Sequence, residues 1–134
     1  MMRNAVRFKS AKFNTTEAKE YFINDICFGD DLAAFLCEKL RERGIDAVEP
    51  WQEDWGWQFE TENCLISVGF NGDEWQIYFE PIRGIFQRLF SEEIDISNLT
   101  KTINQILKSE PEIHEIEWFE STKSGREIDL GAEP

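Results

Sequence analysis

The chain has 134 residues, and its 27 Asp and Glu against 14 Lys and Arg give a formal net charge of −13 at pH 7. A chain of this length is expected to form one domain that buries roughly two thirds of the surface of its unfolded state. The negative charge repels nucleic acid phosphates and anionic lipids, so we expect neither a nucleic acid nor a membrane among the partners.

The sequence also lacks the patterns of several other protein classes. No segment reaches the ~20 apolar residues of a transmembrane helix, and the first ten residues lack the apolar middle of a signal peptide. Cys27, Cys37 and Cys64 form no C-x-x-C pair, and His114 is the single histidine. These features favour a cytoplasmic protein and do not support a disulfide framework, a zinc ribbon or a multi-histidine metal centre.

The first predicted elements are a strand over about residues 5–13 and a helix over about residues 30–43. In the strand, apolar Val6 and Phe8 alternate with basic residues. The helix has acids in its first turn, bases near its end and Gly44 to stop it. Its apolar stripe at helical spacing consists of Leu32, Phe35, Leu36 and Leu40.

Three further strands are predicted at residues 55–61, 64–70 and about 73–80, as an antiparallel meander with one covered face and one solvated face. The apolar, covered face would carry Trp55, Trp57, Phe59, Ile66, Val68, Phe70, Trp75, Ile77 and Phe79. The more polar, opposite face would carry Gln58, Glu60, Leu65, Ser67, Gly69, Gln76, Tyr78 and Glu80.

Two turns set the register of these strands. Asn71 and Gly72 favour a two-residue hairpin turn that would place Val68 opposite Trp75, whereas a four-residue loop would keep the same faces. A turn at residues 62–63 would place Trp57 opposite Val68. Apart from the pair next to the first turn, these registers set apolar residues against apolar residues, a common stabilising arrangement in sheets.

A second amphipathic helix is predicted over about residues 97–109, followed by a final strand within residues 112–120. Residues 81–93 have apolar neighbours at helical spacing but are too few for a long helix. We therefore predict a single α+β domain over residues 1–120 and a loose polar tail over residues 121–134. Its fold would be a mainly antiparallel sheet of about five or six strands with two helices packed on one face.

Three segments together resemble a family of small, uncharacterised bacterial proteins. They are "FGDDLAAFLCEKLRERG", "EPWQEDWGWQF" and "EWQIYFEP" followed by "FQRLF". The family pattern contains F-G-x-D-L-A and E-P-x-x-E-D-W-G-W segments, and the resemblance covers about residues 28–118. It implies a bacterial cytoplasmic setting and supports the domain boundaries, and no activity is attached to it.

The tryptophans of the W-G-W segment are the first candidate site. Trp55 and Trp57 could form a stacking platform for a ring, but their register with the next strands favours a place in the core. Gly56 between them would mark a bulge or a close approach of two strands. Trp51 lies before the predicted strand, where it either closes the core or forms a partly exposed anchor for a partner.

Four acids, together with Trp51, are the candidate binding residues. Glu53 and Asp54 precede one strand and Asp73 and Glu74 follow a turn, and these two connections lie at the same end of the predicted sheet. The carboxylates could therefore converge to bind Mg²⁺ or Ca²⁺, to perform acid–base catalysis, or to receive Lys and Arg of a partner. A solvated acidic rim is the simplest description, and no EF-hand spacing is present.

The N-terminal basic residues and the histidine have simpler interpretations. Arg3, Arg7, Lys9 and Lys12 are too few to bind nucleic acid, and pairing with the acidic middle strands is the simpler use for them. His114 is expected to face inward from the final strand.

The function favoured by these patterns is a non-enzymatic protein-interaction module that masks a basic partner, such as a nuclease toxin. Residues 45–82 carry nine acids and no Lys or Arg, and no catalytic constellation or cofactor motif is present. An alternative is a small-ligand or divalent-cation-dependent enzyme that uses Glu53, Asp54, Asp73 and Glu74. A third is an accessory subunit whose free sheet face is buried in an oligomer, since the oligomeric state is left open.

Overall fold

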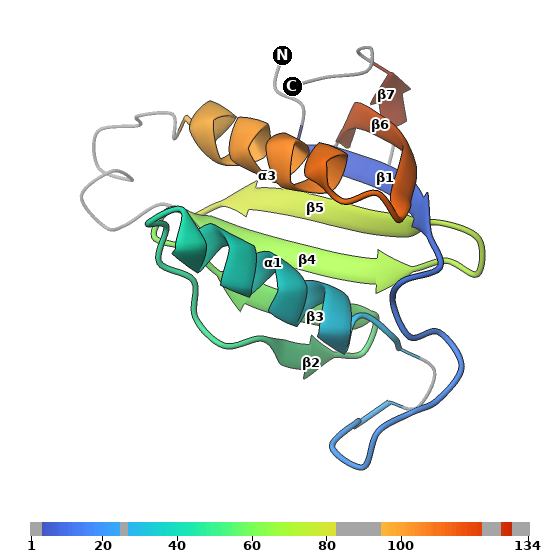
Figure 1. Ribbon diagram of the computed structural model, residues 1–134. Coiled ribbons are helices and arrows are strands. Elements are labelled where there is room, and N and C mark those ends of the chain that lie inside the picture. The colour runs from blue at the N-terminus through green and yellow to red at the C-terminus, as the bar shows by residue number, and fades with distance from the viewer. Residues whose placement is uncertain (1–3, 25–26, 83–94, 122–126, 130–134) are drawn as a thin grey trace.

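The chain folds as α+β, with one antiparallel sheet and two helices in the residues that the computed structural model describes, which are 4–24, 27–82, 95–121 and 127–129 (Figure 1). The sheet has seven strands in the order β2-β3-β4-β5-β1-β6-β7. In chain order the elements are β1 (Ala5–Ser10), α1 (Asp30–Glu42), β2 (Trp51–Glu53), β3 (Gly56–Glu60), β4 (Cys64–Phe70), β5 (Trp75–Pro81), α3 (Ser97–Ser109), β6 (Ile113–Ser121) and β7 (Glu127–Asp129).

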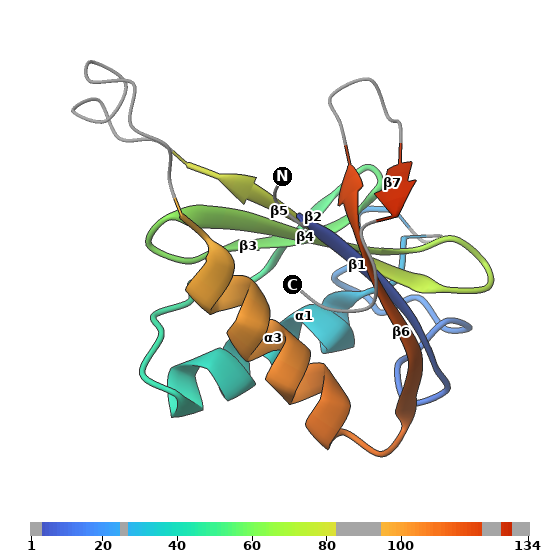
Figure 2. The ribbon, with the colours of Figure 1, turned by 90° about the horizontal axis from the view of Figure 1, so that it is seen from above.

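Both helices lie on the same face of the sheet, as Figure 2 shows from above. Helix α1 contacts β3 and α3, and α3 contacts β6. We call this side the covered face and the other side the open face. The predicted α+β class, with two helices on one face of a mainly antiparallel sheet, is confirmed. The short edge strands β2 and β7 extend the sheet beyond the strands that were predicted.

The helices begin and end for local reasons that the sequence displays. Helix α1 has two acids in its first turn, and Gly44 follows it with a φ of +78°, a left-handed conformation that favours glycine. Helix α3 begins beside Asp95, whose carboxylate accepts a hydrogen bond from the Ser97 backbone N–H (2.9 Å). Hydrogen bonds from Ser97 hold the pKa of Asp95 below its usual value. Helix α3 ends at Ser109, two residues before Pro111.

The core fills the space between the helices and the covered face. The largest fully buried side chains are Trp75, Trp118, Phe8, Phe59, Phe119, Leu32, Leu36, Leu40, Ile66, Ile77, Ile103 and Ile106. All of them except Phe119 belong to the cluster that packs between the layers.

The register of β3 and β4 follows the prediction, and that of β4 and β5 differs by two residues. Trp57 pairs with Val68 as expected, but Val68 pairs with Ile77. Residues 71–74 form a four-residue loop because the Asn71 side-chain oxygen accepts hydrogen bonds from the backbone N–H groups of residues 73 and 74. The predicted covered and open faces of β4 and β5 are kept because the shift is two residues, the period of a strand.

Strand β6 contains a bulge that reverses the predicted direction of His114. Arg7 pairs with Glu117 but Lys9 pairs with His114, so β6 has an extra residue between these pairs. Glu115 within the bulge has a φ of 55°. His114 is therefore exposed, and the prediction that it faces inward is wrong.

Two predicted segments fall wholly or largely outside the described residues. Of the short apolar segment at residues 81–93, only the first two residues are described. Within the segment predicted as a polar tail, β7 pairs with β6 and forms an edge of the sheet. Neither α1 nor α3 is long and apolar enough to cross a membrane.

Candidate functional site: the open face

A row of directly paired residues crosses the open face from one side of the sheet towards the other. Trp51 of β2 begins the row and Phe119 of β6 is its last member before β7. Facing residues on adjacent strands point to the same side of a sheet, so their side chains share this face. The row in order is Trp51, Gln58, Ser67, Tyr78, Ala5 and Phe119.

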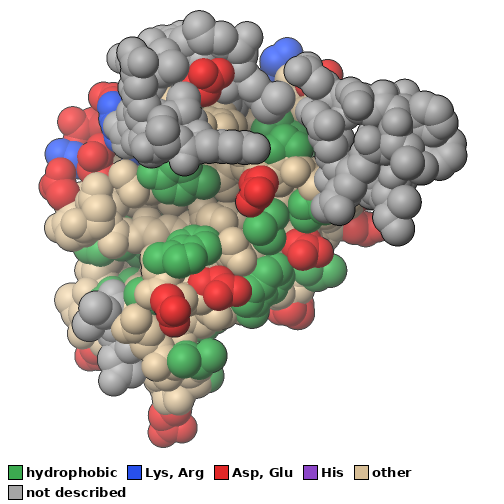
Figure 3. All heavy atoms as spheres, turned by 180° about the vertical axis from the view of Figure 1, so that it is seen from behind, with side chains coloured by type: hydrophobic (Ala, Val, Ile, Leu, Met, Phe, Trp, Pro, Cys, Tyr) green, Lys and Arg blue, Asp and Glu red, His purple; other side chains and the backbone are tan. Residues whose placement is uncertain are grey.

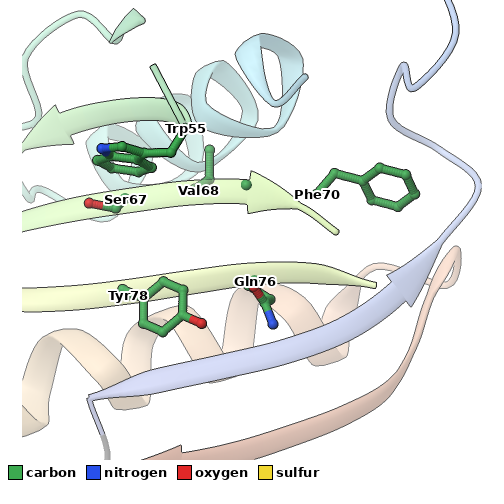
Figure 4. A pocket seen from close by; sticks show the side chains of 7 residues that line it. Trp55, Ser67, Val68, Phe70, Gln76 and Tyr78 are labelled. Carbon is green, nitrogen blue, oxygen red and sulfur yellow. The ribbon is translucent and has the colours of Figure 1, made fainter. Parts of the chain in front are cut away.

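A hollow of about 400 Å³ lies on the open face beside Trp55. Its floor is β4, where Ser67 and Gly69 occupy two successive outward positions and leave space because their side chains are small. Tyr78 and Gln76 of β5 line the other side (Figure 4). The Trp55 side chain is 53% exposed, which is unusual for so large an apolar surface.

The position of Trp55 corrects the prediction that this residue faces the core. Residues 51–53 form a strand where a loop was expected, and Glu53 pairs with Gly56. Asp54 and Trp55 are therefore the two residues of a hairpin turn, and Trp55 does not follow the alternation of the strand. Trp57, two residues later, is in the strand and is buried as predicted.

Gly56 is required by the close approach of β3 to β4. A Cβ atom at this position would lie 2.2 Å from the backbone oxygen of Val68 and 3.2 Å from its carbonyl carbon. No larger residue fits without moving one strand. The predicted close approach is confirmed.

Hydrogen bonds to residues that precede α1 hold the hairpin turn between β2 and β3 in place. The Gln52 side chain accepts hydrogen bonds from the backbone N–H groups of Ile23 and Asn24, and donates to the carbonyl oxygens of Asn24 (2.8 Å) and Cys27 (3.3 Å). The Asp54 carbonyl oxygen accepts from the Asn24 side chain (3.1 Å) and the Cys27 thiol (2.8 Å). Sequence reasoning missed this set of contacts, since Gln52 shows no periodic pattern.

The predicted binding residues lie near one end of the sheet. Trp51 is half-buried on β2, and its indole N–H donates to a Glu53 carboxylate oxygen (2.9 Å). Asp54 is exposed in the hairpin turn, and Asp73 and Glu74 lie in the loop at the same end of the sheet. Among the described residues, no group of three or more Asp, Glu, His or Cys is placed to hold a metal ion.

The basic residues of the first strand mostly pair with acids of or near β6. Arg7 contacts Glu117 (3.0 Å), and Lys12 lies 3.9 Å from Glu112. Lys9 lies 3.7 Å from Asp73 and from Glu115. We expected these basic residues to pair with the acidic middle strands. Of the contacts given above, only that of Lys9 with Asp73 agrees with this expectation. The reason is that β1 lies between β5 and β6, so acids of or near β6 are also within reach. Arg3 lies outside the described residues.

The face around the hollow therefore combines apolar side chains with carboxylates. Figure 3, which views the molecule from behind, shows apolar side chains in the centre of this face with Asp and Glu among them. Glu53 and Asp54 next to Trp55 are exposed, and so are Glu60 and Glu80, which flank Leu65 one row along the sheet.

The three thiols are protonated at neutral pH. Burial raises the pKa of Cys37 to about 11 and that of Cys64 to about 12. The pKa of Cys27 is also raised, by burial and then by the nearby Asp54 carboxylate. A protonated thiol is a poor nucleophile.

No protein-family model, curated protein or solved structure matches this chain. The resemblance of the "FGDDLAAF" and "EPWQEDWGW" segments to a family of small bacterial proteins stays a prediction.

Proposed function

We propose that this protein is a non-enzymatic interaction module of the bacterial cytoplasm that binds a basic protein through the open face of its sheet. The observation that carries the proposal is the 53% exposed Trp55 side chain beside a hollow on an acidic face. Exposed aromatic side chains next to a pocket are typical of protein-binding surfaces, where Trp and Tyr contribute much of the affinity.

The net negative charge of the chain favours a positively charged partner. A net charge of −13 attracts basic proteins over a distance of about a Debye length, which is roughly 8 Å at physiological ionic strength. The exposed carboxylates of Glu53, Glu60 and Glu80 belong to the same face as the hollow, so apolar contact and charge would act on the same partner. A nuclease is one such partner, because its surface must be basic to bind phosphates, and an acidic module could cover that surface.

The proposal can be tested by comparing the binding of matched variants. Immobilised protein should capture a basic protein from the native cell at low salt and release it as the salt concentration rises. Trp55→Ala should abolish the capture. Val48→Ala should preserve it, because Val48 is equally exposed (53%) but does not line the hollow.

Two results would contradict this function. Capture that survives Trp55→Ala would show that the open face is not the binding surface. Absence of any salt-sensitive partner at low salt, together with a stable oligomer that Trp55→Ala dissociates, would instead mean that this face joins copies of the chain.

A further inference from the structure

We propose that the hollow beside Trp55 receives an arginine side chain of the partner. This inference rests on the proposed function and adds to it the chemical group that is recognised. A guanidinium group is planar and cationic, and it combines two preferences that the hollow can serve: contact with aromatic rings, and hydrogen-bond acceptors in its plane.

The aromatic side chains lie on two sides of the hollow. Figure 4 shows the Trp55 indole on one side of Ser67 and the Tyr78 ring on the other, on the neighbouring strand. The faces of Trp and Tyr rings carry negative potential and attract cations, and Trp does so most strongly. An arginine entering over β4 would therefore contact both rings.

Acceptor atoms line the same space. Ser67 has a hydroxyl oxygen with two lone pairs, one of which accepts the Gln58 side-chain N–H (3.0 Å). Gln76 provides a side-chain carbonyl oxygen at the edge of the hollow. These neutral acceptors can bind guanidinium N–H groups, while the exposed Glu53 on the same face supplies negative charge.

The open face already holds one guanidinium group in this way. The Arg7 guanidinium carbon lies 4.9 Å from the centre of the Phe119 ring, and its Nε donates to the Glu117 carboxylate (3.0 Å). Arg7 pairs with Gln76, which lines the hollow, so the two places are neighbours on one face. The combination of ring and carboxylate that this chain uses for its own arginine recurs at Trp55 and Glu53, and none of the described residues that line the hollow is basic.

A lysine would fit the hollow less well. Its ammonium group is compact and strongly hydrated, and it cannot stack its charge flat against a ring. The hollow should therefore distinguish two side chains of equal charge, which separates recognition by shape from attraction by charge alone.

The experiment compares two blocked peptides of equal charge, acetyl-Lys-Gly-Arg-Gly-Lys-amide and acetyl-Lys-Gly-Lys-Gly-Lys-amide. Each is titrated into the isotopically labelled full chain, and the Trp55 indole N–H and the Gly69 amide are followed by NMR. We expect the arginine peptide to shift both signals and to bind roughly two- to five-fold more tightly than the lysine peptide, the range of an exposed cation–π contact.

Two variants connect this preference to the hollow. Gly69→Leu should remove it by filling the space, because a Cβ at Gly69 would meet only the Trp55 backbone oxygen, at 3.4 Å. Trp55→Ala, at an exposed position, should remove it too and serves if the leucine variant does not fold. Leu65→Ala on the same face, outside the hollow, should keep it.

The outcomes separate this inference from the proposed function. Equal affinity for the two peptides at the open face would overturn arginine recognition and leave the basic partner in place. A preference for arginine that survives Gly69→Leu or Trp55→Ala would also overturn it. If neither peptide shifts the Trp55 and Gly69 signals, the inference fails, and the capture experiment then decides the proposed function independently.

Discussion

Trp57 and Trp55 are two residues apart, and they belong to opposite faces of the sheet. Trp57 is 6% exposed and its indole N–H donates to the Cys27 carbonyl oxygen (3.0 Å), whereas Trp55 is 53% exposed beside the hollow. The covered face thus uses its aromatic residues for packing, whereas the open face leaves the Trp55 side chain accessible. Both residues are tryptophans, so residue type does not explain the difference. The difference arises because β3 begins at Gly56, which leaves Trp55 in the turn and puts Trp57 in the strand.

The largest expected difference between the faces is in the free energy of unfolding. Phe59→Ala removes a fully buried ring and should cost about 3–5 kcal/mol. Trp55→Ala should cost less than about 1 kcal/mol, since it leaves no cavity in the core. Urea denaturation monitored by circular dichroism measures both. A similar loss for the two variants would mean that Trp55 is structural after all.

Substitutions at Gly56 and Gly69 should have opposite effects on stability. Gly56→Ala should destabilise the protein by about 3 kcal/mol, because the new methyl group would collide with the Val68 carbonyl group. Gly69→Ala should be neutral or slightly stabilising, because glycine weakens a strand and the open face has room. The denaturation midpoints of the two variants provide the test, and equal midpoints would contradict the close approach.

Two buried tryptophans of the covered face should respond differently to loss of the indole N–H. The Trp118 indole donates to the Asn104 side-chain oxygen (2.9 Å), whereas the buried Trp75 indole N–H has no hydrogen-bond partner among the described residues. Trp118→Phe leaves Asn104 unsatisfied, and it should cost about 2 kcal/mol more than Trp75→Phe. Thermal unfolding of both variants checks this. Equal losses would show that packing, not hydrogen bonding, dominates at Trp118.

The smallest expected effect appears at alkaline pH. The folded state raises the pKa of Cys64 to about 12 and that of Cys37 to about 11, from an ordinary thiol value of 9.0. Their contribution to stability is therefore complete below pH 9.0 and is lost as the pH rises towards those values. Cys64→Ala with Cys37→Ala should flatten the decline of the denaturation midpoint above pH 9.0. An unchanged slope would assign the decline to other groups.

Elements with strong periodicity could be predicted from the sequence, and elements set by single local contacts could not. Leu32, Leu36 and Leu40 identify α1, and the alternation along β4 identifies its two faces because burial follows the period of each element. The two-residue shift of β5 depends on one side chain, Asn71, which favours a longer loop over the predicted turn.

The candidate site was only partly predictable for the same reason. Ser67, Gly69, Gln76 and Tyr78 were assigned to the open face by alternation, and the structure places them around the hollow. Trp55 was assigned to the wrong face, because the period of a strand was extended one residue too far, into a turn. A short strand of three residues leaves too weak a periodic signal to show where the turn begins.

The hydrogen bonds of the Gln52 side chain fix the turn that carries Trp55 before a partner binds. The side chain's two donor hydrogens and its oxygen are all engaged by the backbone of Ile23, Asn24 and Cys27, so the turn that presents Trp55 is joined to the rest of the fold before any ligand arrives. Preorganisation of this kind reduces the conformational entropy lost in a complex. Gln52→Ala should therefore leave Trp55 in place on average but slow the association and widen the range of orientations of its indole.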